Sequence, residues 1–198
     1  MTGDPQPLEG ATPLDADEME GLIPDLQFQQ ELNSWETANI NDATTWVRSR
    51  RSFDPLQIAD LEELHRRMFS STWSWAGSLR RSEKNVSPVR WTDVRLQLQQ
   101  HLDNTRTQLD AAKSAEAIDG TAMRYHHRLV LIHPWSNGNG RHARLATDEL
   151  LRRNGRPMFS WGAVRPPESH VDVRSRYLRA LRAADAGDYR LLEAFVRS

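Results

Sequence analysis

The chain has 198 residues, a net charge of −1 and a hydrophobic share of 38%, enough for one soluble domain with a buried core. A net charge near zero gives no general attraction to nucleic acid or to an acidic membrane surface, so any anion site must be local. The absence of cysteine excludes disulfides, thiolate nucleophiles and cysteine-based zinc sites. It is compatible with a reducing cytoplasm, where we expect the protein to act.

The first part of the chain is predicted to be an irregular acidic leader. Residues 1–23 contain three prolines, and four acidic residues lie within 15–20. The stretch has neither the basic start nor the apolar core of a signal peptide. No apolar run in the chain approaches the ~18 residues of a membrane span. We therefore expect a leader over 1–23, a domain over 24–198 and no membrane partner.

Apolar residues at helical spacing follow one another along most of the domain. These stripes lie at 32–46, 58–68, 94–109, 122–132, 143–150, 173–184 and 192–195. Asp54-Pro55 is predicted to cap the second helix and open its first turn. Residues 73–91 have no helical stripe and contain a glycine and a proline, so an extended loop or a short hairpin is expected there. The sequence predicts a mostly helical single domain.

One segment carries chemistry: Ile132-His-Pro-Trp-Ser-Asn-Gly-Asn-Gly-Arg-His-Ala-Arg144. Its glycine-rich part lies between two helical patterns, so backbone amides are expected to converge at the N-terminus of the second helix. Such an end binds anions, and glycine allows a phosphate to approach the backbone. Arg141 and Arg144 share one face of that first turn and suit a polyphosphate. His133 precedes the loop and is placed to take a proton from a hydroxyl.

Two plainer interpretations were weighed against this one. Two Asn-Gly pairs can simply make a tight turn, but neither flank alternates like a strand, which argues against a hairpin. Histidines near the loop could bind a metal, but His126 and His127 are adjacent and point about 100° apart on a helix. With no His-Glu-x-x-His pattern, we expect His126, His127 and His142 to be packing or helix-surface residues. A phosphate-binding role for the loop is favoured.

The segment resembles the signature of the Fic (Fido) family, His-x-Phe-x-(Asp/Glu)-Gly-Asn-Gly-Arg-x-x-Arg. Two further stretches are similar to the same family: Trp73-Ser-Trp-Ala-Gly-x-x-Arg80 and Ala183-Ala-Asp-Ala-Gly-Asp188. The resemblance covers roughly 20–198 and is strongest over 73–162. Leu8-Glu-Gly-Ala-Thr-Pro-Leu14, Glu20-Gly-Leu-Ile-Pro24 and Asn137 together resemble the subgroup called mobile mystery protein B.

The resemblance implies an all-α, Fic-type helical bundle with a short β-hairpin flap near residues 80–91. The flap would hold the target protein as an added strand. Read alone, the basic residues Arg80, Arg81, Lys84 and Arg90 indicate a solvated loop. The resemblance makes His133 the general base and Trp135, in place of the usual Phe, a core anchor. It places the nucleotide phosphates at the end of the motif, among Gly138, Asn139, Gly140, Arg141 and Arg144.

The implied reaction moves AMP from ATP to a Ser, Thr or Tyr hydroxyl of a target protein, with Mg²⁺ as cofactor. Asn137 departs from the pattern, because most active members carry Asp or Glu there to hold the metal. A neutral carbonyl oxygen attracts a hard cation less strongly, so metal affinity is expected to drop. The alternatives are transfer of another phosphate-containing group, removal of AMP, or a nucleotide- or partner-binding regulator without catalysis.

Two regulatory features follow from the resemblance. Many Fic proteins carry an inhibitory helix with the pattern (Ser/Thr)-x-x-x-Glu-(Gly/Asn), whose glutamate pairs with the second motif arginine. Glu20-Gly21 fits its last two positions, with Ala16 in place of Ser or Thr, so Glu20 is predicted to pair with Arg144. The alternative is a solvated acid. The subgroup is also associated with a small helix-turn-helix partner, mobile mystery protein A, although nothing in this chain shows such a contact.

Overall fold

The computed structural model describes residues 15–24, 29–163 and 169–198. Within these ranges the chain is helical and contains no β-strand; its only extended pairing is an isolated antiparallel bridge between Leu22 and Trp73. The helices are α1 (Ala16–Met19), α2 (Gln29–Ser49), α3 (Ile58–Phe69), the 3-10 turn η1 (Trp91–Asp93), α4 (Val94–Ala111), α5 (Ala115–Ile132), α6 (Asn139–Arg153), α7 (His170–Asp185) and α8 (Arg190–Val196).

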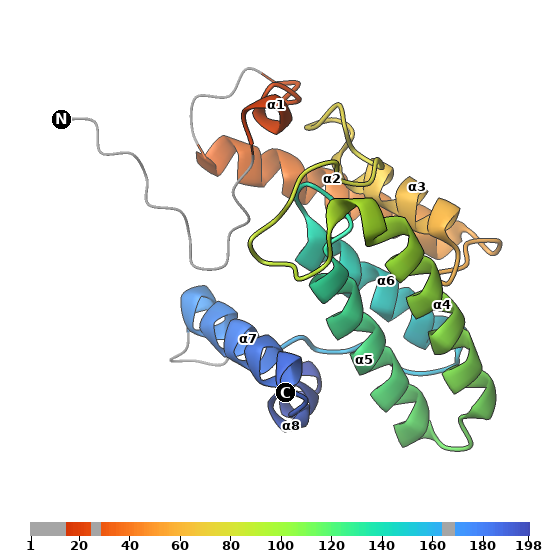
Figure 1. Ribbon diagram of the computed structural model, residues 1–198. Helices are drawn as coiled ribbons and strands as arrows, with labels where there is room; N and C mark the ends of the chain where they lie inside the picture. The colour runs from red at the N-terminus through yellow and green to blue at the C-terminus, as the bar shows by residue number, and fades with distance from the viewer. Residues whose placement is uncertain (1–14, 25–28, 164–168) are drawn as a thin grey trace.

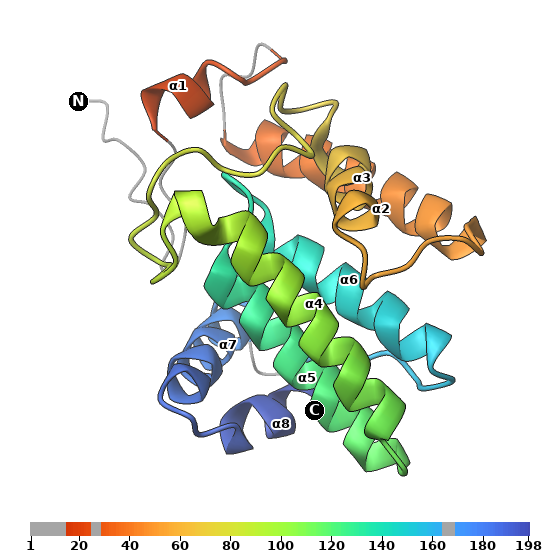
Figure 2. The same cartoon turned by 45° about the vertical axis from the view of Figure 1, so that its right-hand side comes forward.

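Helix α5 is the centre of the bundle (Figures 1 and 2), because it packs against α4, α6, α7 and α8. Helices α2 and α3 form a second pair that packs against α6. The buried faces are those that the apolar stripes predicted: Leu98 and Leu102 of α4 and Leu129 of α5 are at most 2% exposed. The connection from α5 to α6 is short, so the motif loop is held between two core helices. The predicted all-helical fold is confirmed.

The start of α3 differs from the prediction. Asp54-Pro55 does not open the helix, which begins at Ile58 with Gln57 as its N-cap residue. The Asp54 carboxylate instead accepts a hydrogen bond from the backbone N–H of Leu56, 2.9 Å away. Asp54 therefore makes a local turn before the helix, an alternative to capping that is open to a short acidic side chain.

The predicted β-hairpin near 80–91 is absent: these residues form a loop that leads into η1. Its centre is the Arg80 side chain, which is 2% exposed. The guanidinium donates to the carbonyls of Ser82, at 2.7 Å, and Val89, at 2.5 Å. Those carbonyls would otherwise be available to a strand ladder, and Pro88 has no N–H to give. The loop closes around a buried cation.

The solvated-loop interpretation of the basic residues is wrong for two of the four. Arg80 and Lys84 are buried, whereas Arg81 and Arg90 are exposed. Burial lowers the pKa of Arg80. The burial of Arg80 could not be predicted from the sequence. The groups that accept hydrogen bonds from Arg80 are main-chain carbonyls, which any residue type provides.

The described part of the leader is not irregular. After α1, the N–H of Ile23 donates to the carbonyl of Thr72, and that of Ser74 donates to the carbonyl of Gly21, at 2.9 and 2.8 Å. At Gly21, an added Cβ would lie 2.4 Å from the Trp75 ring, so this close approach requires glycine. Residues 1–14 lie outside the described ranges. Among the helices of the described residues, none has the length and apolarity to cross a membrane.

Candidate functional site

The motif loop is bounded by two residues with left-handed backbone. His133, the C-cap of α5, has φ 54° and ψ 62°, and Gly138, the N-cap of α6, has φ 76°. Position 138 requires glycine for two reasons. Its positive φ is unfavourable for other residues, and a Cβ there would lie 2.5 Å from the Phe69 ring. These two turns reverse the chain between helices and direct the start of α6 into the loop.

The Asn139 side chain closes the loop. Its Oδ1 accepts from the Trp135 N–H at 2.9 Å, and its Nδ2 donates to the Trp135 carbonyl at 2.7 Å. Trp135 itself is 0% exposed, as expected for a core anchor. Both polar atoms of the Asn139 side-chain amide are thus bonded within the protein. Only the backbone N–H of Asn139 is available to a ligand.

The first turn of α6 has the features of an anion site. Its first intrahelical hydrogen bond runs from His142 N to the Gly138 carbonyl, at 2.9 Å. Among the described residues, the N–H groups of Asn139, Gly140 and Arg141 have no hydrogen-bond partner. Three unsatisfied amides at the positive end of a helix dipole form a cradle that suits an anion. The predicted anion site was Gly138, Asn139 and Gly140, but the Gly138 N–H is taken by Asn137 Oδ1; phosphate binding at the cradle stays a prediction.

Arg141 extends from this turn to a residue that sequence reasoning missed. Its guanidinium lies 2.5 Å from the carboxylate of Glu36, which is 4% exposed and also accepts from the Trp73 indole N–H at 3.0 Å. Glu36 therefore fixes one edge of Arg141 and neutralises part of its charge. A signal was present, since Glu36 lies at helical spacing from the buried Ala43 and Val47.

Arg144, one turn further along α6, lies in an aromatic environment. Its guanidinium carbon is 4.4 Å from the centroid of Tyr177 and 5.9 Å from that of Trp161. The Nε of Arg144 is buried without a hydrogen-bond partner within the described residues. An arginine held by ring faces keeps its charge for a ligand, because the aromatic contacts supply no counter-ion.

His133 is the candidate base, and its surroundings keep it neutral. It is 7% exposed, and burial lowers its pKa to about 4, with Arg80 and Lys84 as further causes. Its Nδ1 lies 3.2 Å from the Val130 carbonyl, which can only accept. The ring proton is therefore on Nδ1 and the lone pair on Nε2. A neutral imidazole with its lone pair on Nε2 has the form that a general base needs.

A cavity of about 260 Å³ adjoins His133, between the 81–90 loop, α5 and α7. Its walls are largely apolar and include Val86, Leu178 and Leu181. His133 itself forms part of the lining of this cavity.

His65 of α3 is a second residue that sequence reasoning missed. It is 0% exposed and joins two separate segments: Gly77 N donates to its Nδ1 at 2.9 Å, and its Nε2 donates to the Asn137 carbonyl at 3.1 Å. The ring stacks on Trp135 with centroids 4.5 Å apart. Burial holds the pKa of His65 well below its usual value. A histidine among the apolar positions Leu61 and Leu64 was the available signal.

Asn137 does not supply an evident metal site. Its Oδ1 accepts from the Gly138 N–H at 2.7 Å. Within the described ranges, no group of three or more His, Cys, Asp or Glu side chains is arranged to hold a metal ion. One neutral oxygen, already bonded to the backbone, does not fit the oxygen-rich sites of Mg²⁺.

The expected contact between Glu20 and Arg144 is not made in this structure. Glu20 is exposed and has no ion pair with any described residue. Glu18 contacts the site instead: its carboxylate lies 2.5 Å from Lys84 Nζ and accepts from Ser82 Oγ at 3.2 Å. Hydrogen bonds from Lys84, the Asp15 N–H and Ser136 of the motif loop lower the pKa of Glu18 against its desolvation. The inhibitory role of Glu20 stays a prediction.

The other histidines near the motif loop are packing residues. His126, His127 and His142 are at most 4% exposed. Nδ1 of His142 accepts from the Trp135 indole N–H at 3.2 Å, and its Nε2 donates to the Leu61 carbonyl at 3.0 Å. His142 thereby ties the loop to α3.

Comparison with known proteins identifies the family. A model of the Fic/DOC family matches residues 55–151, the part of the chain that contains the motif loop. The protein adenylyltransferase fic-1 of Caenorhabditis elegans is 31% identical over 151 residues, which are 74% of this chain and 27% of the relative. The chain therefore spans about a quarter of the length of that curated relative.

Solved structures of the same kind share the fold. A structure of Fic-1 residues 134–508 from C. elegans matches with a TM-score of 0.66 and 27% identity, over 90% of this chain and 51% of the other. The BepC protein of Bartonella tribocorum, solved with AMPPNP, matches with a TM-score of 0.71 and 14% identity, over 92% of this chain and 97% of the other. With its motif loop, helical bundle and relatives in agreement, this chain belongs to the Fic/DOC family.

Proposed function

We propose that this chain is a protein adenylyltransferase that moves AMP from ATP to a Ser, Thr or Tyr hydroxyl of a target protein. The observation that carries the proposal is a neutral, buried His133 next to an amide cradle with two arginines. The names of its curated relatives support the same reaction class. Those relatives are much longer, so the activity of this chain is argued here from its own site.

The first step is the binding of phosphate. The unpartnered amides of Asn139, Gly140 and Arg141 hold the phosphate group that reacts, where the helix dipole favours negative charge. Arg144 binds the outer phosphates with its uncompensated charge. Arg141 presents the edge of its guanidinium that does not face Glu36. Together they fix the polyphosphate and stabilise the charge that develops as it breaks.

The second step is the transfer itself. His133 Nε2 takes the proton of the target hydroxyl while the hydroxyl oxygen forms a bond to the α-phosphorus. The bond from the α-phosphorus to the oxygen that bridges to the β-phosphate breaks, and pyrophosphate leaves with that oxygen. His133 ends protonated and then releases its proton to solvent. Because burial disfavours the charged imidazole, this release restores the neutral base.

Isotopic labelling tests the proposal and its alternatives. The chain is incubated with a lysate of its source cells and with ATP labelled at either the α- or the γ-phosphate, and labelled protein is separated by electrophoresis. AMP transfer predicts label from the α-position alone. Label from γ alone identifies phosphotransfer, and label from neither position favours a binding regulator; each of these results contradicts the proposal.

Two accessory proposals accompany this function. Mg²⁺ would enter with the ATP phosphates, because the loop provides only the Asn137 amide as a side-chain ligand, and its affinity is expected to be low. A helix-turn-helix partner follows from the subgroup resemblance alone. Co-purification of the chain with a small helix-turn-helix protein from the same source would support it.

A further inference from the structure

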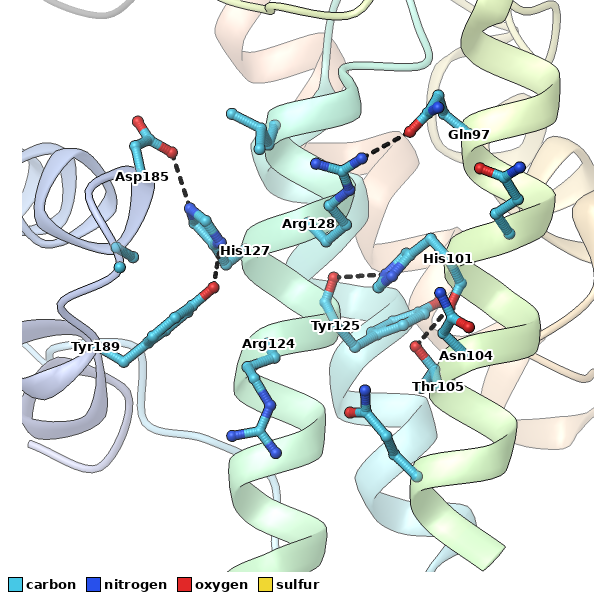
Figure 3. A pocket seen from close by; sticks show the side chains of 15 residues that line it. Gln97, His101, Asn104, Thr105, Arg124, Tyr125, His127, Arg128, Asp185 and Tyr189 are labelled. Atoms are coloured by element: carbon cyan, nitrogen blue, oxygen red, sulfur yellow. Dashed lines mark hydrogen bonds and ion pairs between the residues drawn. The ribbon is translucent and has the colours of Figure 1, made fainter.

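A polar groove of about 500 Å³ lies over α5, with α4 on one side and the turn between α7 and α8 on the other (Figure 3). The α4 wall is a stripe of carboxamides, one or two helical turns apart: Gln97, Gln100, Asn104 and Gln108. Arg124 and Arg128 extend from α5 at the spacing that places two side chains on one face. This surface is outside the motif loop and has no part in the proposed phosphate binding.

The groove adjoins the cavity at His133. His127, Leu131 and Asp185 line both spaces. A ligand that lies in the groove therefore reaches the wall of the cavity that His133 lines.

The wall between the two spaces is preformed. His127 Nε2 lies 2.8 Å from the Asp185 carboxylate, and its Nδ1 lies 3.2 Å from the Tyr189 hydroxyl. These contacts, drawn in Figure 3, fasten the α7–α8 turn to α5. The groove can accept a ligand without first having to form.

The groove favours a negatively charged ligand. Arg128 donates to Gln97 Oε1 at 2.7 Å, a neutral partner that leaves its charge uncompensated. Arg124 is exposed and has no ion pair with any residue in the described ranges. The one acidic residue of the lining, Asp185, is engaged by His127. Arginine binds carboxylates through paired N–H groups.

The carboxamides favour a polypeptide over a small anion. Each carries a donor and an acceptor, the pair that a peptide group requires. From Gln97 to Gln108 the stripe spans roughly 16 Å of helix, about the length of five residues of extended chain. The Nδ1 of His101 adds an acceptor to this wall, because the Nε2 donates to the Tyr125 carbonyl at 3.2 Å.

We propose that this groove binds an extended, acidic segment of the target protein, next to the hydroxyl that is modified. The proposal rests on the proposed transfer reaction and adds a substrate class to it. It predicts that targets carry Asp or Glu within about five residues of the modified hydroxyl, the length set by the stripe.

Peptide binding without nucleotide tests the groove separately from catalysis. Three fluorescein-labelled peptides are compared by anisotropy at low salt: Gly-Glu-Asp-Ser-Glu-Asp-Gly, its Gln/Asn counterpart and its Lys counterpart. We expect the acidic peptide to bind at least roughly tenfold more tightly than the other two, with an affinity that falls as salt rises.

Charge reversal locates the binding. Arg124→Glu should weaken binding of the acidic peptide by roughly tenfold or more, and Arg128→Gln should also weaken it. The matched control is Arg95→Glu, an exposed arginine of α4 that pairs with Glu62 rather than facing the groove. Equal thermal melts by circular dichroism keep folding out of the comparison.

Three results would overturn the proposal. They are equal binding of the three peptides, equal affinities of the Arg124→Glu and Arg95→Glu variants, and full displacement of the peptide by millimolar inorganic phosphate, which would mark a small-anion site. Peptide binding with no transfer of α-label would remove the enzyme function and leave the groove. Transfer of α-label without peptide binding would support the enzyme function and remove the peptide-binding role of the groove.

Discussion

His133 holds a backbone conformation that costs free energy. Outside glycine, only His133 and Trp161 have positive φ among the described residues. Such a conformation costs about 1–3 kcal/mol and persists where the surroundings fix it. Here Arg80 fixes the backbone of His133. The Arg80 Nε donates to the His133 carbonyl at 2.7 Å, and the Arg80 backbone N–H donates to the Pro134 carbonyl at 2.8 Å. Arg80 is thus a positioning residue for the base.

Arg141 has two roles, and its substitution should reveal both. Arg141→Ala removes a phosphate ligand and also strands the Glu36 carboxylate in the interior. Breaking a fully buried pair costs about 3–5 kcal/mol; because the Arg141 side chain is 39% exposed, we expect a loss of about 2–3 kcal/mol in the free energy of unfolding. Urea denaturation measures this loss.

The double variant Arg141→Ala with Glu36→Gln separates the two roles. Glutamine still accepts from the Trp73 indole and leaves no buried charge, so most of the lost stability should return. ATP affinity should stay low in both variants. If Arg141→Ala unfolds at the same urea concentration as the unmodified chain, the ion pair contributes nothing to the fold.

Asn137 offers a direct test of the metal argument. Asn137→Asp adds a negative charge to the loop and should raise Mg²⁺ affinity, and with it the rate of AMP transfer, by roughly tenfold or more. Calorimetric titration of Mg²⁺-ATP measures the binding, with Asn137→Ala as the control for loss of the hydrogen bond to Gly138. No gain in affinity for the Asp variant would mean that Asn137 serves only the turn.

At this scale, sequence predicted what is local. His133, Arg141 and Arg144 could be proposed from the sequence, because the roles proposed for them depend on spacing within one loop and one helical turn. Glu36 and His65 could not be assigned, because each acts on the loop from a distant helix. Their position on buried helix faces was visible, but a polar residue in an apolar stripe does not name its partner.

Among the elements, the N-terminal segment is where resemblance and structure lead to different expectations. The resemblance predicts that Glu20 restrains the site through Arg144. The contacts of the structure favour Glu18, which joins α1 to Lys84 and to Ser136 of the motif loop. We expect Glu18→Ala to release residues 15–23 and Glu20→Ala to leave them in place, because Glu20 is exposed.

Hydrogen exchange detects this release. Faster exchange of the Ile23 and Ser74 amides, which bond across the segment, is expected for Glu18→Ala alone. ATP affinity of the same two variants then tests inhibition. Tighter binding for Glu20→Ala with no effect of Glu18→Ala would favour the family arrangement over the contacts described here.

Helices were predictable from periodicity, and the loop over 80–91 was not. The stripe of α3 requires only that Leu61, Leu64 and Met68 share a face, which spacing alone establishes. The conformation of the loop depends on the position of the Arg80 guanidinium, which donates hydrogen bonds to main-chain carbonyls. The family resemblance predicted a hairpin here, but the burial of the Arg80 side chain gives a loop instead.

In the whole molecule, buried neutral histidines should make stability depend on pH. Burial lowers the pKa of His101, His133 and His142 to about 4 and that of His126 to about 3. An unfolded histidine has a pKa of about 6.5, so between these values the unfolded chain binds more protons. Stability should be full above about pH 6.5 and should fall steadily toward pH 4.

Urea midpoints at several pH values check this expectation. Each of these histidines has a lower pKa in the folded chain than in the unfolded chain. The slope of the unfolding free energy between pH 6 and 4.5 should therefore reflect several protons taken up on unfolding. The variant His101→Gln, which keeps a donor for the Tyr125 carbonyl, should reduce the slope by about one proton. A midpoint that stays constant over this range would mean that the histidines are not held neutral by burial.

The central claim is that His133 is the base beside a preformed phosphate cradle, and His133→Ala tests it most directly. Transfer of α-label from ATP to protein should fall by about 10²–10⁴. ATP affinity measured by calorimetry should stay nearly unchanged, because the amides of α6 and the two arginines are untouched. Transfer at the unmodified rate by the His133→Ala variant would contradict the account.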